Sequence, residues 1–522
     1  MPLFTVLLSL LAVGCTDTKD DAPSDDTGGA SSDDTGASSD CAARFEGADG
    51  GVTDVTDAMV GAYDIDEPGT LWLGACTWTM NLRGLADNVR VIGEGRDLTI
   101  LDGGALAPVV EADEVIGLTL GSLTLTNGYN TTSGGGLDLD DVQATLTALR
   151  LSGNRSTSGG GGAAIRDSEA VLDDLIVEGN VADDFGGGLF INDSTAALSA
   201  VTLTGNTSTE GGGASFYDSS VSWTDGLVTD NSAEDGGGLS INDDDVTLSG
   251  LSFLDNVAAS FGGGLDSYGS AITLDDVTFE GNSSGSGGGG ATLSRGSAAL
   301  TDVTFYSNRS EDGAGLEVRN DGEADIHGAT FEGNVAEDVG GALVLSEAKV
   351  TLTDSVVTGN TAPDTGGGFY IRGDSDVALS GVVVDNNTAG DDGGGLFIYD
   401  STVELSEATI DNNTAAMYGG GLFASDGSNL VLRDSTLSNN AAEKGGGLYL
   451  NDGSDAHMED TSVAGNAALD DGGGLYLRAS TLEVERGEFT TNDPDDLYNY
   501  GPGESSDWGA DASFSCDDSG CG

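Results

Sequence analysis

Residues 236–256 read GGGLSINDDDVTLSGLSFLDN, and near copies of this stretch recur through most of the chain. Each copy opens on a glycine cluster and Leu, runs through short apolar alternations, and ends with an aromatic or aliphatic residue three places before Asn. The third position of the cluster moves from residue 136 to residue 474 in thirteen steps, so 338 residues give a mean step of 26. A repeat this regular predicts a solenoid in which each unit stacks on an equivalent unit.

Within this unit, three pairs of apolar residues alternate with polar ones: Leu239 and Ile241, Val246 and Leu248, Leu251 and Phe253. Spacing of two is typical of strands with one buried face, and turn residues such as Asn242-Asp243-Asp244 separate the runs. The sequence therefore predicts an all-β fold, a single parallel β-helix with three short strands per turn of about 26 residues. Roughly 16 rungs, each about 4.8 Å from the next, would form one rod.

The glycine clusters and the repeated asparagines are interpreted as architectural. Glycine occurs 85 times and its clusters open the first strand, where we expect positive φ and close approach of stacked backbones. The asparagines predict a ladder of buried amides that bond to turn backbone and to one another. Its members are Asn154, Asn180, Asn206, Asn231, Asn256, Asn282, Asn308, Asn334, Asn360, Asn387, Asn413, Asn440, Asn466 and Asn492.

Two further patterns resemble a known repeat. Phe-x-x-Asn occurs in four successive units, from Phe253/Asn256 to Phe331/Asn334, and Gly340-Gly341-Ala342-Leu343 gives the sequence Gly-Gly-Ala-aliphatic. Together they resemble the polymorphic outer membrane protein repeat of the pectin-lyase-like, right-handed β-helix superfamily, over roughly residues 89–492. The resemblance implies a right-handed coil and a cell-surface setting, and it implies little about activity.

The first residues, MPLFTVLLSLLAVGC, contain an apolar run too short to span a bilayer and suited to a signal peptide. Small residues before Cys15 resemble the bacterial lipobox, which implies cleavage after residue 14 and lipidation of Cys15. Residues 15–40 then form an acidic tether without apolar periodicity. By analogy with such lipoproteins we expect an outer-membrane, surface-exposed protein; a periplasmic or a secreted protein is the alternative.

Four further cysteines lie outside the repeat, at Cys41, Cys76, Cys516 and Cys521. An exported chain permits disulfides, and pairing within each end, Cys41 with Cys76 and Cys516 with Cys521, is favoured among three possible patterns. Because the ends of a β-helix expose strand edges, we expect residues 41–88 to be an N-terminal cap, 89–492 the β-helix and 493–522 a C-terminal cap.

The chain is strongly acidic, with 17 basic against 89 acidic residues and a formal charge of −72. This charge excludes nucleic acid as a natural partner, since phosphates require basic groups. Acidic pairs precede the glycine clusters, and they are consistent either with solvated turns or with weak Ca²⁺ sites. The calcium hypothesis names Asp184, Asp235, Asp312, Asp338, Asp392 and Asp471; no other cofactor is predicted.

Five consecutive units place an aromatic residue directly after the first apolar residue of the glycine cluster: Tyr370, Phe397, Phe423, Tyr449 and Tyr476. These side chains are expected to point outward between two buried positions and to form a stripe along one face. One interpretation is self-stacking that stabilises the C-terminal half. The other is an exposed platform for a glycan or a partner protein.

No catalytic site is predicted. The superfamily's lyase motifs, which resemble W-I-D-H and R-x-P-x-x-R, do not occur, and the units accept almost no insertions that could wall a cleft. The two histidines, His327 and His457, stand 130 residues apart and should both face solvent. The function favoured is a non-catalytic structural or adhesive module that binds glycan or envelope partners along its side; the alternatives are a polysaccharide lyase or hydrolase and a spacer without a ligand.

Overall fold

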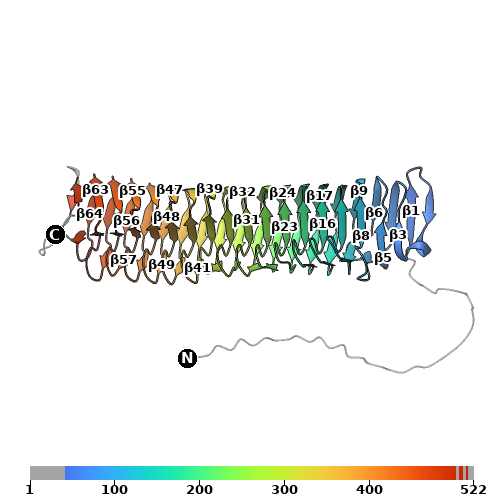
Figure 1. Ribbon diagram of the computed structural model, residues 1–522, viewed down its shortest axis with the longest axis horizontal. Helices are drawn as coiled ribbons and strands as arrows, with labels where there is room; N and C mark the ends of the chain where they lie inside the picture. Colours follow the sequence, from blue (N-terminus) through green and yellow to red (C-terminus); the bar gives the residue numbers. More distant parts are fainter. Residues whose placement is uncertain (1–40, 501–504, 509–512, 515–522) are drawn as a thin grey trace, which may run out of the picture. The chain divides into compact units, whose positions relative to one another are not determined.

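The computed structural model describes residues 41–500, 505–508 and 513–514, which form a right-handed parallel β-helix (Figure 1). Helix in the described residues is limited to the 3-10 turn η1 (Thr56–Ala58). The predicted all-β solenoid is therefore confirmed. A typical turn contains β27 (Leu239–Asn242), β28 (Asp245–Ser249) and β29 (Ser252–Leu254), followed by a fourth strand of two residues, β30 (Val257–Ala258).

Three long faces run along the coil, each built from equivalent strands of successive turns. The first face includes β8 (Val110–Asp113), β12 (Leu137–Asp140) and β62 (Leu475–Arg478). The second face runs from β4 (Gly69–Leu73) and β6 (Val89–Ile92) to β63 (Thr481–Glu485). The third face runs from β7 (Ile100–Asp102) to β64 (Glu488–Thr490). Pairing is parallel and in register, so that Leu239 lies beside Leu265 and Val246 beside Ile272.

The glycine cluster has two different local causes. Gly236 adopts φ 62°, a left-handed conformation that residues with a Cβ adopt at a cost. At Gly237 and Gly238 the limit is space, because an added Cβ would lie 2.5 and 2.4 Å from the carbonyl oxygens of Gly263 and Gly264 in the next turn. The coil can therefore keep its tight rise only with almost no side chains here.

The asparagine column is a continuous buried ladder. Asn334 donates its Nδ2 to the carbonyl of Phe305 at 2.9 Å. Its Oδ1 accepts both the backbone amide of Asn308 at 3.0 Å and the Nδ2 of Asn308 at 3.1 Å. The same pattern continues to Asn360. Each amide thus satisfies backbone groups at a corner that the strand ladders leave unpaired.

The interior holds columns of like side chains. Phe253, Phe279, Phe305 and Phe331 stack with ring centroids 4.7 to 4.9 Å apart, and all four are fully buried. Stacking at this distance follows from the rise between turns, which equals the strand spacing of a sheet. The regular spacing of Phe-x-x-Asn in the sequence therefore becomes a continuous aromatic column beside the asparagine ladder.

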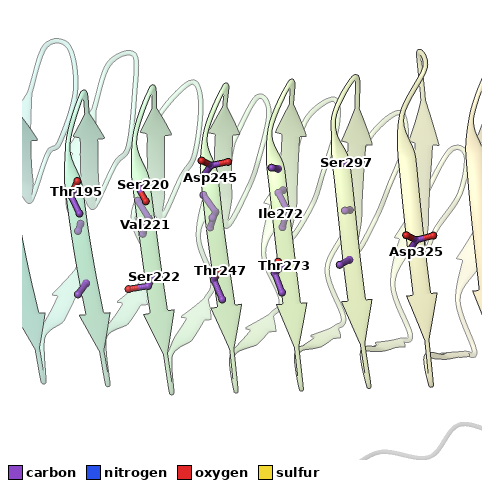
Figure 2. Close-up of a pocket in the computed structure, with 16 residues that line it drawn as sticks. Thr195, Ser220, Val221, Ser222, Asp245, Thr247, Ile272, Thr273, Ser297 and Asp325 are labelled. Atoms are coloured by element: carbon purple, nitrogen blue, oxygen red, sulfur yellow. The ribbon is translucent and has the colours of Figure 1, made fainter.

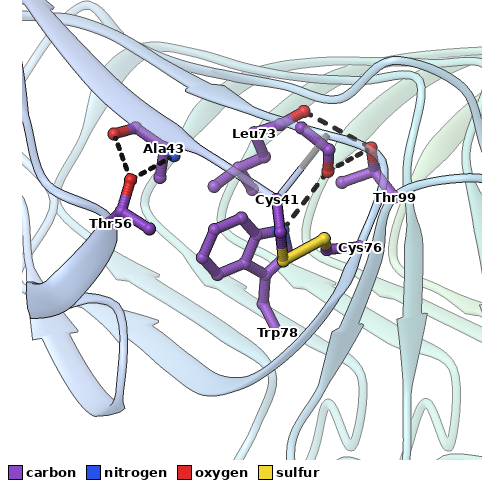
Figure 3. The surroundings of a disulfide bond; sticks show 8 residues. Cys41, Ala43, Thr56, Leu73, Cys76, Trp78 and Thr99 are labelled. Carbon is purple, nitrogen blue, oxygen red and sulfur yellow. Dashed lines mark hydrogen bonds between the residues drawn. A yellow bond between two sulfur atoms is a disulfide. The ribbon is translucent and has the colours of Figure 1, made fainter. Parts of the chain in front are cut away.

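The N-terminal end of the coil is closed by antiparallel pairing. Strand β1 (Ala43–Gly47) pairs antiparallel with β2 (Val52–Asp54) and with β4, which covers the edge that β4 would otherwise expose. Cys41 and Cys76 form a disulfide across this closure, with Cα atoms 5.4 Å apart (Figure 3). Beside it, Gly74 accepts hydrogen bonds from Thr99 Oγ1 and Trp78 Nε1.

Parallel pairing also enters the segments expected as caps. Strand β3 (Gly61–Asp64) already pairs parallel with β5 (Thr77–Arg83), because residues 71–82 carry the same alternation of buried Leu and Met as the repeat. At the other end β65 (Leu497–Tyr500), β66 (Ser505–Trp508) and β67 (Ser513–Phe514) pair with the last repeat.

Several predictions fall outside the described residues: cleavage after residue 14, lipidation of Cys15, the tether 15–40, and the pairing of Cys516 with Cys521. Within the part of the chain that is described, no helix has the length and apolar character needed to cross a bilayer.

Candidate functional site: a lateral trough

A shallow polar trough of about 570 Å³ runs across the second face (Figure 2). Six successive strands form its floor: β21 (Thr195–Ser199), β24 (Ser220–Thr224), β28, β32 (Ala271–Asp275), β35 (Ser297–Thr301) and β39 (Glu323–His327). Alternate residues of each strand point into the core, and those that point outward are short. Such a surface is open, regular and hydroxyl-rich over six turns.

The trough exists because the outward side chains of six successive turns are mostly short. One outward column runs Val171, Ala197, Ser222, Thr247, Thr273, Ala299 and Asp325, so no side chain is longer than Val or Thr until the carboxylate of Asp325. Val171 remains 46% exposed, and Asp325 is also exposed. The hollow is therefore a product of register: small side chains 25 or 26 residues apart line up only when the turns stack.

A second hollow of about 570 Å³ adjoins the first at the corner between the first and second faces. It shares the lining residues Thr195, Ser220, Asp245 and Ala271 with the first hollow. Besides Ser194, Ser219 and Gly269, the rest of its lining is acidic: Asp193, Asp218, Asp243 and Asp244. We call this second hollow the corner trough. Together with the trough of the second face it forms one continuous concave surface, which we call the lateral trough.

Corner geometry explains why aspartate gathers here. Asp193, Asp218 and Asp243 have φ of 49°, 48° and 57°, in the left-handed region that Asp tolerates better than most residues. Of the 37 non-glycine residues with positive φ in the described chain, 19 are aspartates. Much of the chain's acidity is thus placed by the corners of the coil, and the side chains project outward from them.

Asp244 is the exception, because its side chain is buried. The same column contains Ser168, Ser194 and Ser219, and each of their hydroxyls accepts a hydrogen bond from a backbone amide of the preceding turn. Asp244 stands where the neighbouring turns have serine, and its carboxylate accepts hydrogen bonds from the backbone amides of Ser219 and Asn242. Burial, the dominant effect, raises the pKa of Asp244 to about 7, although these two hydrogen bonds lower it.

The aromatic stripe is more covered than the sequence suggests. Phe423, Tyr449 and Tyr476 are only 5%, 3% and 5% exposed, while Tyr370 and Phe397 are half-buried. The five rings stack at centroid distances of 4.7 to 5.5 Å, and Tyr498 extends the stack at 5.0 Å. The side chains do lie outside the main core, in a cluster of their own.

The covering comes from the segment that precedes each glycine cluster. Tyr418, which the sequence reasoning did not include, lies 4.8 Å from the ring of Tyr449 and 6.5 Å from that of Phe423. It pairs with Asp392 and Lys444 in a column of parallel bridges. Because stacking and this column occupy the ring faces, the stripe is built as a packing element; a binding role for it stays a prediction.

The aspartates named in the calcium hypothesis belong to two columns. Asp235 and Asp392 each accept the backbone amide of the equivalent residue in the next turn, Phe261 and Tyr418, at 3.1 and 3.0 Å. Asp312 caps the amide of Val339 in the same way. Asp184 and Asp338 stand one position earlier in their units.

These hydrogen bonds give Asp235, Asp312 and Asp392 a structural role that needs no metal ion. Burial, and next the charge of Asp391, raises the pKa of Asp392 to about 7. Among the described residues, no three acidic, histidine or cysteine side chains are grouped to hold a metal ion. Calcium binding at these positions remains a prediction.

A second set of carboxyls was not singled out from the sequence. Asp266 and Glu317 occupy the column of the aromatic stripe in earlier turns, with Thr292 between them. Burial raises the pKa of both, that of Asp266 to about 7. The guanidinium of Arg319 lies 3.8 Å from Glu317 and 3.7 Å above the ring of Phe261. Asp266 and Glu317 are covered in the same way as the aromatic stripe, by the segment that precedes each glycine cluster.

The histidines do not meet. His327 lies in β39, where its Nδ1 is 2.9 Å from Thr353 Oγ1, and its side chain is 58% exposed. His457 lies 3.4 Å from a carboxylate oxygen of Glu483 on the next turn. Each histidine therefore sits on the outer surface beside neighbours of its own turn or the next.

Three solved structures illustrate what the fold is similar to. A chain of the Vag8–C1 inhibitor complex matches at 15% identity over 86% of this chain and 100% of its own, with a TM-score of 0.36. A mannuronic acid-specific family 6 polysaccharide lyase from human gut microbiota matches at 10% identity over 66% and 81%, with a TM-score of 0.26. The A-module of the Azotobacter vinelandii mannuronan C-5 epimerase AlgE4 matches at 12% identity over 84% and 91%, with a TM-score of 0.20.

Likenesses at TM-scores this low support no statement about binding or activity. No curated protein sequence matches the chain. The model of the family "Right handed beta helix region" matches residues 223–388 and 364–505, which together cover more than half of the sequence. The parallel, in-register coil and this match agree, and the chain belongs to the right-handed β-helix family.

Proposed function

We propose that this chain is a non-catalytic, lipid-anchored cell-surface protein that binds a glycan along the side of its β-helix. The observation that carries the proposal is the lateral trough, a concave polar surface that crosses six turns without interruption. An extended polymer presents similar hydroxyl groups at regular intervals, and a solenoid presents similar side chains at regular intervals. Ligand sites in proteins are usually concave and contain a few polar groups that fix the orientation of the ligand.

The chemistry of the trough selects among polymers. Its hydroxyl and carboxylate groups can donate to and accept from sugar hydroxyls, and no basic residue lines either hollow. A polyanion would meet the corner aspartates and the overall charge of −72. The proposed ligand is therefore a polysaccharide that carries no negative charge.

Binding is tested by filling the trough. Ala299 lies in the trough and Ala378 lies in the same outward column beyond it, and both are exposed. The purified chain would be applied to an immobilised glycan panel, together with the variants Ala299→Trp and Ala378→Trp. Ala299→Trp should weaken binding at least tenfold and Ala378→Trp less than twofold. Equal binding by both variants, or no binding by the wild type, would refute the proposal.

The same mixtures can reveal catalysis. A lyase or hydrolase would release unsaturated or reducing ends from the bound polysaccharide, whereas a binding module leaves the polymer intact. Release of such products at a rate above the buffer control would replace the proposed module with an enzyme.

The anchor is tested in cells. Metabolic labelling with palmitate should mark the wild-type chain and leave Cys15→Ala unlabelled. Protease added to intact cells should release the β-helix by cutting within residues 16–40. Full-length protein that survives protease on intact cells, and is cut only after the outer membrane is opened, would contradict surface display.

A further inference from the structure

Tyr268 differs from the stacked aromatic residues of the first face. It ends β31 (Leu265–Tyr268), points away from the core, and is 40% exposed. Its neighbours in the same column are Asn242 and Ser294, so no ring stacks on it from the adjacent turns. The rings of the stripe, by contrast, occupy one another's faces. Tyr268 therefore has a ring surface that the protein does not use for packing.

Arg295 holds this ring in place at an energetic cost. It has φ 58°, in a corner column where Asp or Gly is usual, and a residue with a long side chain adopts this conformation at a cost. Its Nη1 donates to the Tyr268 hydroxyl at 2.5 Å, and its guanidinium carbon lies 5.3 Å from the ring centroid. A strained residue that orients an exposed aromatic ring is typical of a preorganised contact surface.

Tyr268 directly precedes a residue that lines the corner trough. Gly269, the next residue, lines that trough together with Asp243. A Cβ on Gly269 would lie 2.3 Å from Asp243 Oδ1, so only glycine leaves room for the carboxylate here. The corner column of aspartates is interrupted at this point, and the space beside Tyr268 contains a hydrogen-bond acceptor.

We propose that Tyr268, Arg295 and Asp243 form a sugar-binding subsite at the end of the lateral trough, specific for a neutral hexopyranose. The apolar C–H face of the sugar would stack on the Tyr268 ring, as apolar surfaces do on aromatic side chains. A sugar hydroxyl would donate to Asp243, and Arg295 would hold the ring and leave one face open. The proposal rests on the proposed function and names the class of its ligand.

Charge decides the class of sugar. The corner trough, which includes Gly269, is also lined by Asp193, Asp218 and Asp245, whose charges would repel a uronic acid or a sulfated sugar. A neutral pyranose is not repelled by these carboxylates, and it still offers an apolar face and hydroxyl groups for binding. Exposed tyrosine and arginine are also the residues most often found at the centre of recognition surfaces.

The test compares two exposed tyrosines. Tyr306 is 41% exposed and lies at the end of β36 (Thr304–Tyr306) on the third face, away from the trough. The full chain, Tyr268→Ser, Tyr306→Ser and Arg295→Ala would be titrated with soluble neutral glucan, mannan and galactan, and with a polyuronate. We expect Tyr268→Ser to weaken binding of the preferred neutral polymer at least tenfold, Arg295→Ala several-fold, and Tyr306→Ser less than twofold.

Nitration supplies a second readout that does not depend on a variant. In the wild-type chain, the neutral polymer should protect Tyr268 from tetranitromethane and leave Tyr306 and Tyr399 reactive. If a neutral polymer binds but Tyr268→Ser binds equally, or Tyr268 stays unprotected, the subsite is refuted while glycan binding stands. Tighter binding of polyuronate than of every neutral polymer also refutes it. If no polymer binds, both the subsite and the proposed function fall.

Discussion

At the scale of single residues, the asparagine ladder shows how one side chain serves three turns. Asn334 accepts two hydrogen bonds from Asn308, donates to the carbonyl of Phe305, and donates again to Asn360 Oδ1. All of these groups are buried, so water cannot replace the lost partner. The repeat of Asn in the sequence is a repeat of this local requirement.

Removing one rung of the ladder should be costly. We expect Asn334→Ala to lower the free energy of unfolding by about 3 kcal/mol, because buried donors and acceptors on both sides lose their partners. Asn192→Ala is the control, since the only side-chain hydrogen bond described for Asn192 goes to exposed Asp193. Denaturant unfolding followed by circular dichroism measures both; similar losses in the two variants would contradict the role of the ladder.

Asp244 gives a pH dependence whose sign follows from its environment. Its pKa in the folded chain is raised to about 7, so between about pH 4 and pH 7 the folded chain binds a proton that the unfolded chain releases. The stability contributed by this proton is present at low pH and is lost as pH rises through 7. Serine, which occupies this column in the neighbouring turns, does not ionise and so loses no stability as the pH rises.

We therefore expect Asp244→Ser to be more stable than the wild type at pH 8, by about 1–3 kcal/mol, and to lose most of this advantage at pH 5. The exposed neighbour Asp245, changed to Ser, is the control and should show no such pH dependence. Unfolding curves at the two pH values supply the comparison. A wild-type chain that is instead more stable at pH 8 than at pH 5 relative to Asp244→Ser would reverse the assignment.

At the scale of elements, the segment before each glycine cluster decides what the first face exposes. It lies over the outward column of that face, which explains why Phe423 and Glu317 are both buried although their strands alternate in the usual way. The alternation rule describes which side of a strand a residue occupies. It does not describe what a later or earlier segment of the same turn covers.

The aromatic column should accordingly behave as a packing element. We expect Phe423→Ser to reduce the free energy of unfolding by about 3 kcal/mol, because it removes a buried ring that contacts rings on both neighbouring turns. Tyr399→Ser, at a position that is 43% exposed in the adjacent turn, should cost far less. Thermal unfolding measures both, and glycan binding by Phe423→Ser should match that of the wild type.

If Phe423→Ser instead abolished glycan binding while its unfolding curve stayed unchanged, the aromatic stripe would be a binding platform and not a packing element. The lateral trough would then lose its place as the primary site.

At the scale of the whole molecule, stability is a sum over stacked turns, and the ends of the stack are its exposed points. The antiparallel closure by β1 protects the first edge, and the disulfide between Cys41 and Cys76 joins that closure to the coil. Because each turn contacts only its neighbours, loss of this closure should loosen the nearest turns and leave distant turns intact.

Breaking the disulfide tests this closure. We expect Cys41→Ser to destabilise the N-terminal turns by about 2–4 kcal/mol, since a cross-link that spans 35 residues restricts the unfolded chain. Hydrogen exchange should rise in residues 43–92 and stay unchanged around the lateral trough. Uniform acceleration along the coil, or none at all, would contradict the independent behaviour of its ends.

The fold was accessible to sequence reasoning because its causes are local and periodic. A glycine cluster, alternating apolar residues and Asn at a constant spacing predict strands, corners and stacking without knowledge of distant contacts. The same reasoning placed the aromatic residues on an outward column and left open whether they pack on one another or form an exposed platform. It named aspartates before the glycines without seeing that several of them cap backbone amides.

The coil, its period, its buried columns and its acidity can be derived from the amino-acid sequence, since each follows from residues that recur every 25 to 27 positions. The hollows of the surface and the burial of particular carboxyls can be read only from the stacked turns. The trough needs short side chains from six turns to align. The burial of Asp244 depends on its place in the corner serine column, and that of Glu317 on the segment that lies over it. Such properties belong to the stacked assembly, because no single unit of the sequence contains them.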